Sequence, residues 1–161
     1  MTQVVEIAKL PVEQQRLKLK SYLRSIDEQA ANKQLPAYVA EALQIVERGG
    51  DSFWWNQAWL RCAICALAAE RYRIAYGHWP DSLNSLVPEF LTKIPLDPFD
   101  AKPLRYGRLN DGVVIYSVGL DEKDDGGTLD RQNLTRPGTD FGFQLWDVNR
   151  RRQPWLPAGK D

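Results

Sequence analysis

The spacing of apolar residues changes near residue 104, and this change limits the folds that the chain can adopt. Upstream, apolar residues recur at intervals of three, four and seven, which is typical of amphipathic helices. Downstream, they alternate with polar residues, which is typical of strands. The sequence therefore predicts an α+β fold, in which N-terminal helices pack on a small antiparallel sheet of about three strands.

Helix boundary signals divide the first half of the chain into three predicted helices. Pro11 and Pro36 suit the first helical position, so we expect helices to start at both. Gly49-Gly50 ends the second helix in this interpretation. A third helix, which Asp51 or Ser52 can cap, runs from about residue 53 to residue 76. Gly77 then closes the third helix.

The third predicted helix is apolar on two sides. One stripe comprises Leu60, Ile64, Leu67 and Ile74, and the other comprises Trp59, Cys62, Ala66 and Ala69. A helix that is apolar on more than one side is usually buried on more than one side. We therefore expect this long helix to lie between the first two helices and a downstream element.

Three segments in the second half have the character of strands. The segments 104–109 and 113–118 flank Asn110-Asp111-Gly112, a strong hairpin signal because Asp-Gly accommodates the positive φ angles of a tight turn. The third segment is 141–148, in which apolar and polar residues again alternate. A short helix over 83–87 and a proline-containing stretch of turns lie between the long helix and the first strand.

The predicted organisation is a helical segment over 1–50, an α+β domain over 51–149 and a basic tail over 150–161. Lys plus Arg and Asp plus Glu both number 21, so the net charge offers no electrostatic argument for nucleic acid as the main partner. A solvated tail is therefore the favoured interpretation of Arg150-Arg151-Arg152. No signal peptide is visible, and no apolar stretch reaches the roughly 18 residues of a membrane span.

An acidic loop after the second strand is a candidate metal site. Asp121, Asp124 and Asp125 precede Gly126-Gly127, and Asp130 follows. Ca²⁺ prefers carboxylate and carbonyl oxygens, which such a loop supplies. The spacing is not that of an EF-hand, whose third and twelfth positions would here be lysine and glutamine. A solvated acidic loop without metal remains the alternative.

Cys62 and Cys65 form a C-x-x-C motif inside the predicted long helix. A structural zinc site needs two more ligands, and the chain has one histidine, His78. A redox pair would belong at a helix N-terminus, whereas at least two turns precede Cys62. We therefore predict that both cysteines are reduced, buried and without metal.

Two further constellations offer alternative functions. Asp97, Asp100 and Asp121 would be the carboxylates of a hydrolase, but the sequence shows no nucleophile and base to accompany them. Trp54 and Trp55 would form an aromatic surface for a ligand or partner in a larger envelope protein. The enzyme hypothesis is the weakest of these readings.

Three consecutive stretches resemble the globular part of the major pseudopilin of type II secretion and the wider group of type IV pilin-like proteins. They read ALAAERYRIAYGHWPDSLNSLVP, IPLDPFDAKPLRYG and DGVVIYSVGLDEKDDGG. They are similar to the end of the pilin helix with its following turn, to a Pro-x-Asp-Pro-aromatic segment, and to a strand with its calcium loop. The second and third, extended by GTDFGFQLWD, also resemble C-terminal regions of large uncharacterised bacterial proteins, many from planctomycetes.

The resemblance implies a non-enzymatic structural or protein-interaction module in the cell envelope or outside the cytoplasm. It also implies a structural Ca²⁺ ion bound by Asp121, Asp124 and Asp125, with Leu120 offering its carbonyl. Pseudopilins begin with a cleaved leader and an apolar span, whereas residues 1–51 here contain two amphipathic helices. The fold is therefore the better supported part of the resemblance, and the protein partners stay unidentified.

Overall fold

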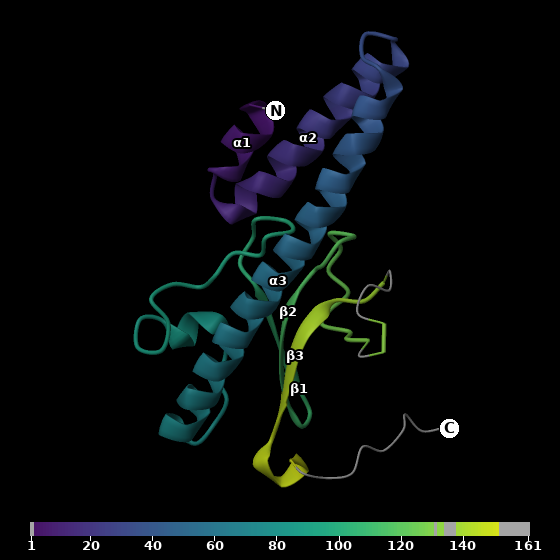
Figure 1. Cartoon of the computed structure of the whole chain (residues 1–161). Coiled ribbons are helices and arrows are strands. Elements are labelled where there is room, and N and C mark those ends of the chain that lie inside the picture. The colour runs from purple at the N-terminus through teal and green to yellow at the C-terminus, as the bar shows by residue number, and fades with distance from the viewer. Residues whose placement is uncertain (1, 131, 134–137, 152–161) are drawn as a thin grey trace, which may run out of the picture.

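The computed structural model describes residues 2–130, 132–133 and 138–151. It has the predicted α+β fold, with helices packed on a three-stranded antiparallel sheet (Figure 1). The elements are α1 (Thr2–Ala8), α2 (Val12–Ala31), α3 (Ala37–Tyr76), the 3₁₀ turn η1 (Leu83–Leu86), β1 (Arg105–Leu109), β2 (Gly112–Ser117), β3 (Phe141–Trp146) and the 3₁₀ turn η2 (Val148–Arg150).

The sheet has the order β1-β2-β3, and both pairs are antiparallel, as the sequence predicts. Each observed strand lies within its predicted segment, apart from the start of β2 at Gly112. The register pairs Leu109 with Gly112 across the turn, and Gly112 also faces Trp146 of β3. β2 is therefore the buried central strand, and β3 is an edge strand.

α3 is a single helix of 40 residues, so the predicted break at Gly49-Gly50 is wrong. The reason is packing: a Cβ atom on Gly50 would lie 2.6 Å from the ring of Trp54, one turn later. Helical side chains lean toward the preceding turn, and the glycine makes room for this indole. Asp51 and Ser52 consequently lie inside the helix rather than at its cap.

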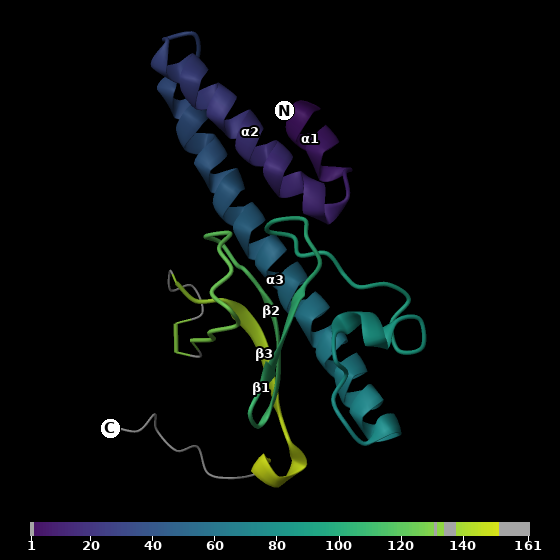
Figure 2. The ribbon, with the colours of Figure 1, turned by 180° about the vertical axis from the view of Figure 1, so that it is seen from behind.

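The prediction that α3 is buried on both apolar sides is also wrong. Its second stripe is covered, with Cys62 and Ala69 fully buried beneath the sheet. The first stripe is open: the exposed fractions are 55% for Leu60, 43% for Ile64, 67% for Leu67 and 70% for Ile74. α3 crosses one face of the sheet (Figures 1 and 2). The side of α3 that is turned away from the strands is the side that stays open.

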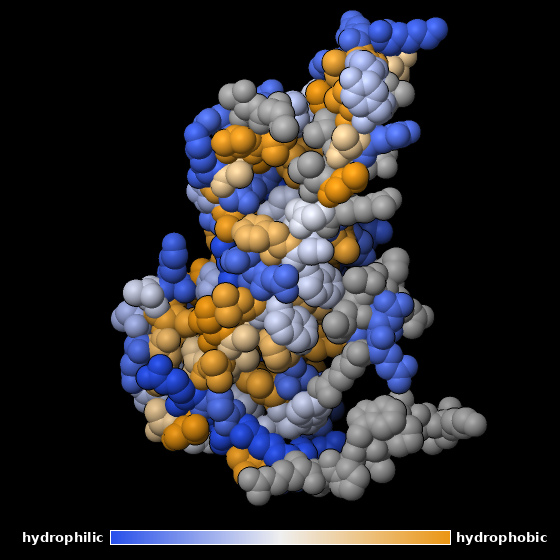
Figure 3. Space-filling model, in the orientation of Figure 1, coloured by the Kyte–Doolittle hydropathy of each residue, from blue (hydrophilic) through white to orange (hydrophobic). Residues whose placement is uncertain are grey.

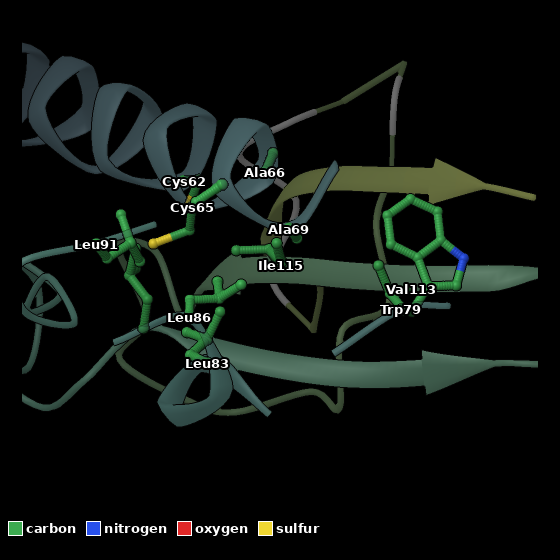
Figure 4. Packing of buried hydrophobic residues seen from close by; sticks show 12 residues of the cluster. Cys62, Cys65, Ala66, Ala69, Trp79, Leu83, Leu86, Leu91, Val113 and Ile115 are labelled. Atoms are coloured by element: carbon green, nitrogen blue, oxygen red, sulfur yellow. The ribbon is translucent and has the colours of Figure 1, made fainter. Parts of the chain in front are cut away.

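The core between α3 and the sheet consists of two clusters. In the first, Cys62 and Cys65 of α3 face Leu86, Leu91 and Ile115 (Figure 4). The second joins α2 and α3 to the start of β3, and its buried members are Leu19, Leu23, Trp54, Ala58, Phe99, Val118 and Phe141. The N-terminal helices are thus attached to the sheet domain through side chains of α2 as well as through the chain itself.

α1 is a seven-residue helix that the sequence analysis does not anticipate. It contacts α2 and lies beside it in both views (Figures 1 and 2). Within the described residues, no helix combines the length and apolar character that crossing a membrane would need. Most of the predicted tail, residues 152–161, lies outside the described residues.

Candidate functional site

Asp97 anchors the end of β2, where the acidic loop begins. Its carboxylate is fully buried, and its Oδ1 accepts hydrogen bonds from the Phe99 amide and the Ser117 hydroxyl, both at 2.9 Å. Its Oδ2 accepts from the Val118 amide and the Arg105 guanidinium, both at 3.0 Å. Burial raises the pKa of Asp97, and these donors oppose that shift.

The carboxylates considered for acid–base chemistry do not form one group. Asp97 and Asp100 share the guanidinium of Arg105, with 3.1 Å between Arg105 Nη1 and Asp100 Oδ1. Burial disfavours the ionised form of Asp100, but hydrogen bonds from Arg105 and the Lys102 amide, together with the charges of these two residues, lower its pKa. Asp121 instead accepts a hydrogen bond from the Gly138 amide at 3.3 Å. Asp97 and Asp100 are thus both paired with a positively charged side chain of the protein, that of Arg105.

Arg16 of α2 clamps the first residues of the acidic loop. It is 2% exposed and donates to the carbonyls of Phe99 and Leu120, both at 3.3 Å. It also forms an ion pair with Glu122, which Lys20 contacts as well. Burial opposes the ionisation of Glu122, but hydrogen bonds from Lys20 and Arg16 lower its pKa. The carbonyl of Leu120, a predicted calcium ligand, therefore faces Arg16 in this structure.

The three predicted aspartate ligands point in different directions. Asp121 bonds to Gly138, as described above. Asp124 Oδ1 accepts from the hydroxyl of Tyr116 at 3.0 Å, and Asp124 Oδ2 lies 3.7 Å from Nε of Arg105. Burial, together with this hydrogen bond, raises the pKa of Tyr116 to about 12. The structure therefore places Asp121 and Asp124 on separate partners.

Asp125 instead meets Asp140, a residue that the sequence analysis does not single out. Asp140 is 1% exposed, and its Oδ2 accepts hydrogen bonds from the amides of Asp125 at 3.0 Å and Gly127 at 2.8 Å. Its Oδ1, like Oδ2 of Asp125, is buried without a hydrogen-bond partner among the described residues. Burial raises the pKa of Asp140 to about 6, and the charges of Asp124 and Asp125 add to this shift.

This corner of the loop gathers the negative charges of Asp124, Asp125 and Asp140. Among the described residues, these two buried carboxylate oxygens have no hydrogen-bond partner, an arrangement that is costly unless a proton or a cation is present. Considering the described part of the chain, no three His, Cys, Asp or Glu side chains are placed to hold a metal together. A Ca²⁺ ion here would therefore take further oxygens from the backbone and water, as Ca²⁺ sites commonly do.

Cys62 and Cys65 are fully buried free thiols, and their predicted burial is confirmed. Burial raises the pKa of both, to about 12 for Cys65. A thiol that stays protonated is a poor nucleophile and a poor metal ligand. The motif is therefore part of the core against Leu86 and Leu91 (Figure 4).

The tryptophans considered as a binding surface contribute to the core instead. Trp54 is 4% exposed, and Trp55 stacks on Phe141 with 4.0 Å between ring centroids. Trp59 also stacks on Phe141, at 6.0 Å. These indoles connect α3 to the start of β3, and Trp59 also lines an open hollow beside that strand.

Described residues line two hollows that flank the edge strand β3. One of about 490 Å³ lies between α3 and β3 and is lined mainly by apolar side chains, including Leu67, Phe143 and Leu145. The other, of about 410 Å³, is lined by Trp59 and Leu129 and reaches Asp140. Both are open surface features, and only the second is lined by a residue of the acidic corner, Asp140.

Comparison with known proteins gives no further guide to this site. No family model matches the chain, and neither the curated proteins nor the solved structures include a match.

Proposed function

We propose that the chain is a non-enzymatic structural or protein-interaction module, similar to the globular part of a pseudopilin, with a structural Ca²⁺ ion in its acidic loop. The resemblance in sequence and the packing of one long helix on three antiparallel strands support the module. The calcium proposal rests on the buried oxygens of Asp125 and Asp140, which have no hydrogen-bond partner among the described residues. A location in the cell envelope or outside the cytoplasm is part of the same proposal.

Charge explains why a cation would stabilise this corner. Asp124, Asp125 and Asp140 are close enough for the first two to raise the pKa of the third. Bound Ca²⁺ would remove this repulsion and satisfy the two buried oxygens. Asp121 and Leu120 stay in the proposed ligand set through the resemblance, although they would have to leave Gly138 and Arg16 to join it.

Calcium is expected to raise the melting temperature, because it would bind the folded loop and hardly the unfolded chain. At a hundred times its dissociation constant, a ligand adds about 2.7 kcal/mol of stability. For a chain of this length the shift is about 5–10 °C. Asp125→Asn should abolish most of the shift, since it removes the charge of a carboxylate whose Oδ2 is buried at the proposed site. Thermal melts with Ca²⁺ and with chelator measure both effects.

Asp130→Asn is the matched control, because Asp130 belongs to the same loop but accepts hydrogen bonds from the amides of Gln132 and Asn133. It should retain most of the calcium shift. A shift below about 1 °C for the wild type would contradict the calcium site, leaving a solvated acidic loop.

In chelator, the pH dependence of stability is expected to report on Asp140. Its pKa is about 6 in the folded protein and about 3.9 in an unfolded chain, so the folded state binds more protons between these values. The contribution of Asp140 to stability therefore falls as the pH rises from about 4 to about 6. Glu70 acts in the opposite direction at lower pH, since hydrogen bonds from Arg151 and Arg73 overcome burial and lower its pKa to about 2.

The readout is therefore the difference between the wild type and Asp140→Asn in urea unfolding at several pH values. The stability of the wild type should decline relative to the variant across this interval, and Ca²⁺ should remove the decline. Parallel pH profiles for the two proteins in chelator would show that Asp140 does not titrate as its surroundings imply.

A second candidate function is ligand or partner binding within a larger envelope protein. The observation that favours it is the apolar hollow between α3 and β3. Leu145→Arg would insert a charge into this hollow and should weaken such binding while leaving the calcium-dependent melt unchanged.

A further inference from the structure

α3 carries an apolar stripe that the described part of the chain leaves open. The α3 stripe consists of Phe53, Leu60, Ile64, Leu67 and Ile74, with exposed fractions of 43%, 55%, 43%, 67% and 70%. Apolar atoms reach the surface along the lower half of the path of α3 (Figure 3, compare Figure 1). Exposed apolar patches of this kind mark interaction sites more often than chance.

The spacing of the stripe indicates that its partner is another helix. Phe53, Leu60, Leu67 and Ile74 follow one another at intervals of seven, with Ile64 four residues after Leu60. A seven-residue repeat keeps one seam facing a second helix through left-handed supercoiling, whereas a flat or irregular partner does not require it. Within the chain, α2 and the strands contact other faces of α3.

We propose that the stripe pairs with the same stripe of a second copy, with the two α3 helices antiparallel around a two-fold axis near Ala63 and Ile64. Equal intervals make the stripe self-complementary under such an axis. Leu60 would lie beside Leu67 of the second copy, and Phe53 beside Ile74. Each Ile64 would face an Ala63, which offers the small neighbour that a large side chain needs to pack.

Charge favours the antiparallel direction over the parallel one. Arg71 occupies the seam position between Leu67 and Ile74, and its guanidinium lies 5.6 Å from the ring centre of Phe90. A parallel pair in register would bring two Arg71 side chains together across the seam, at a cost in stability. The antiparallel pair places each Arg71 near an Asn56 instead, so no like charges meet.

The available area is sufficient for a weak but specific dimer. A large apolar side chain has on the order of 200 Å² of accessible surface. At their exposed fractions, the five side chains of the α3 stripe therefore expose on the order of 500 Å² per copy. Two copies together bury on the order of 1,000 Å², near the lower end of specific interfaces. The dimer should therefore form at high protein concentration and dissociate on dilution.

The first test is the solution mass over a dilution series that reaches roughly 1 mM, where weak specific interfaces are populated. The mass is expected to rise from 18.4 kDa toward twice that value. Leu67→Glu should keep the chain monomeric throughout, with a normal melting temperature because the side chain is mostly exposed. Leu17→Glu is the matched control on α2, since Leu17 is 49% exposed outside the stripe, and it should dimerise like the wild type.

The second test is cross-linking through introduced cysteines, which requires Cα atoms within about 7 Å. Ile64→Cys should form a disulfide between copies, because position 64 lies at the axis. Ile74→Cys should not, because in the antiparallel pair the two residues lie about 30 Å apart along the helices. The buried native thiols stay in place in both variants.

Four results would overturn the proposal: a wild type that is monomeric throughout, equal loss of the dimer in Leu17→Glu, self-linking of Ile74→Cys, or a mass that grows beyond two copies. The inference names the partner and surface of the proposed interaction module and therefore rests on that proposed function. The two fail separately, because a monomer with a calcium-dependent melt would contradict only the dimer. A dimer with no calcium response would contradict only the calcium site.

Discussion

Asp97→Ala is expected to lower the free energy of unfolding by about 3–5 kcal/mol, because it leaves buried donors without their acceptor. The Phe99 amide, the Val118 amide and the Ser117 hydroxyl all bond to this carboxylate. Arg105 keeps Asp100 as a partner, so the loss comes mainly from the three neutral donors. Urea unfolding followed by circular dichroism measures the change.

Asp81→Ala is the control for removing a carboxylate from an ion pair. The side chain of Asp81 is 86% exposed and bonds to Arg108 at 2.8 Å. Exposed pairs contribute little, so the expected change is below about 1 kcal/mol. A comparable loss in the two variants would contradict the view that burial, rather than the ion pair itself, makes Asp97 important.

The sheet was predictable from the sequence because its determinants are local. Alternation selects the strands, and Asp111-Gly112 fixes the reversal between β1 and β2. The structure adds a second reason for this glycine: with φ at 155°, a Cβ at Gly112 would lie 1.9 Å from the carbonyl oxygen of Leu145 on β3. That close approach comes from the third strand, and the local sequence does not reveal it.

The continuity of α3 could not be read from propensity. Each glycine in a helix interior costs roughly 1 kcal/mol relative to alanine, which made Gly49-Gly50 resemble a helix end. Packing outweighs that cost, since Trp54 lies over Gly50 and α2 contacts α3. Asp51 likewise turns toward Arg16, at 3.9 Å between charged atoms, instead of capping a new helix.

The exposure of the α3 stripe and the role of Asp140 could not be predicted from the sequence either. Periodicity identifies the residues that share a helix face, but it does not say whether anything covers that face. Asp140 lies 15 residues after Asp125, and only the return of the chain at the start of β3 brings them together. The one local signal is an isolated acidic residue directly before a predicted strand.

Phe141→Ala is expected to be the other severe substitution, lowering the free energy of unfolding by about 3–5 kcal/mol. Phe141 is 1% exposed and stacks on Trp55 and Trp59 of α3. It also meets Phe99 edge to face, with 5.9 Å between ring centroids. Its removal leaves a cavity where α3, the 97–99 turn and the sheet meet, and such cavities close only in part.

Phe53→Ala is the control for Phe141→Ala. It tests whether the expected fall in the free energy of unfolding depends on the buried position of Phe141 or follows from any Phe→Ala substitution. Phe53 is 43% exposed on the α3 stripe, so at a protein concentration that keeps the chain monomeric the change should be below about 1 kcal/mol. Phe141→Ala should also weaken the calcium-dependent melt, since Phe141 directly follows Asp140 and fixes its backbone. An equal loss of stability in the two variants would mean that the aromatic cluster does not hold α3 to the sheet. An unchanged calcium shift in Phe141→Ala would mean that the acidic corner is positioned independently of it.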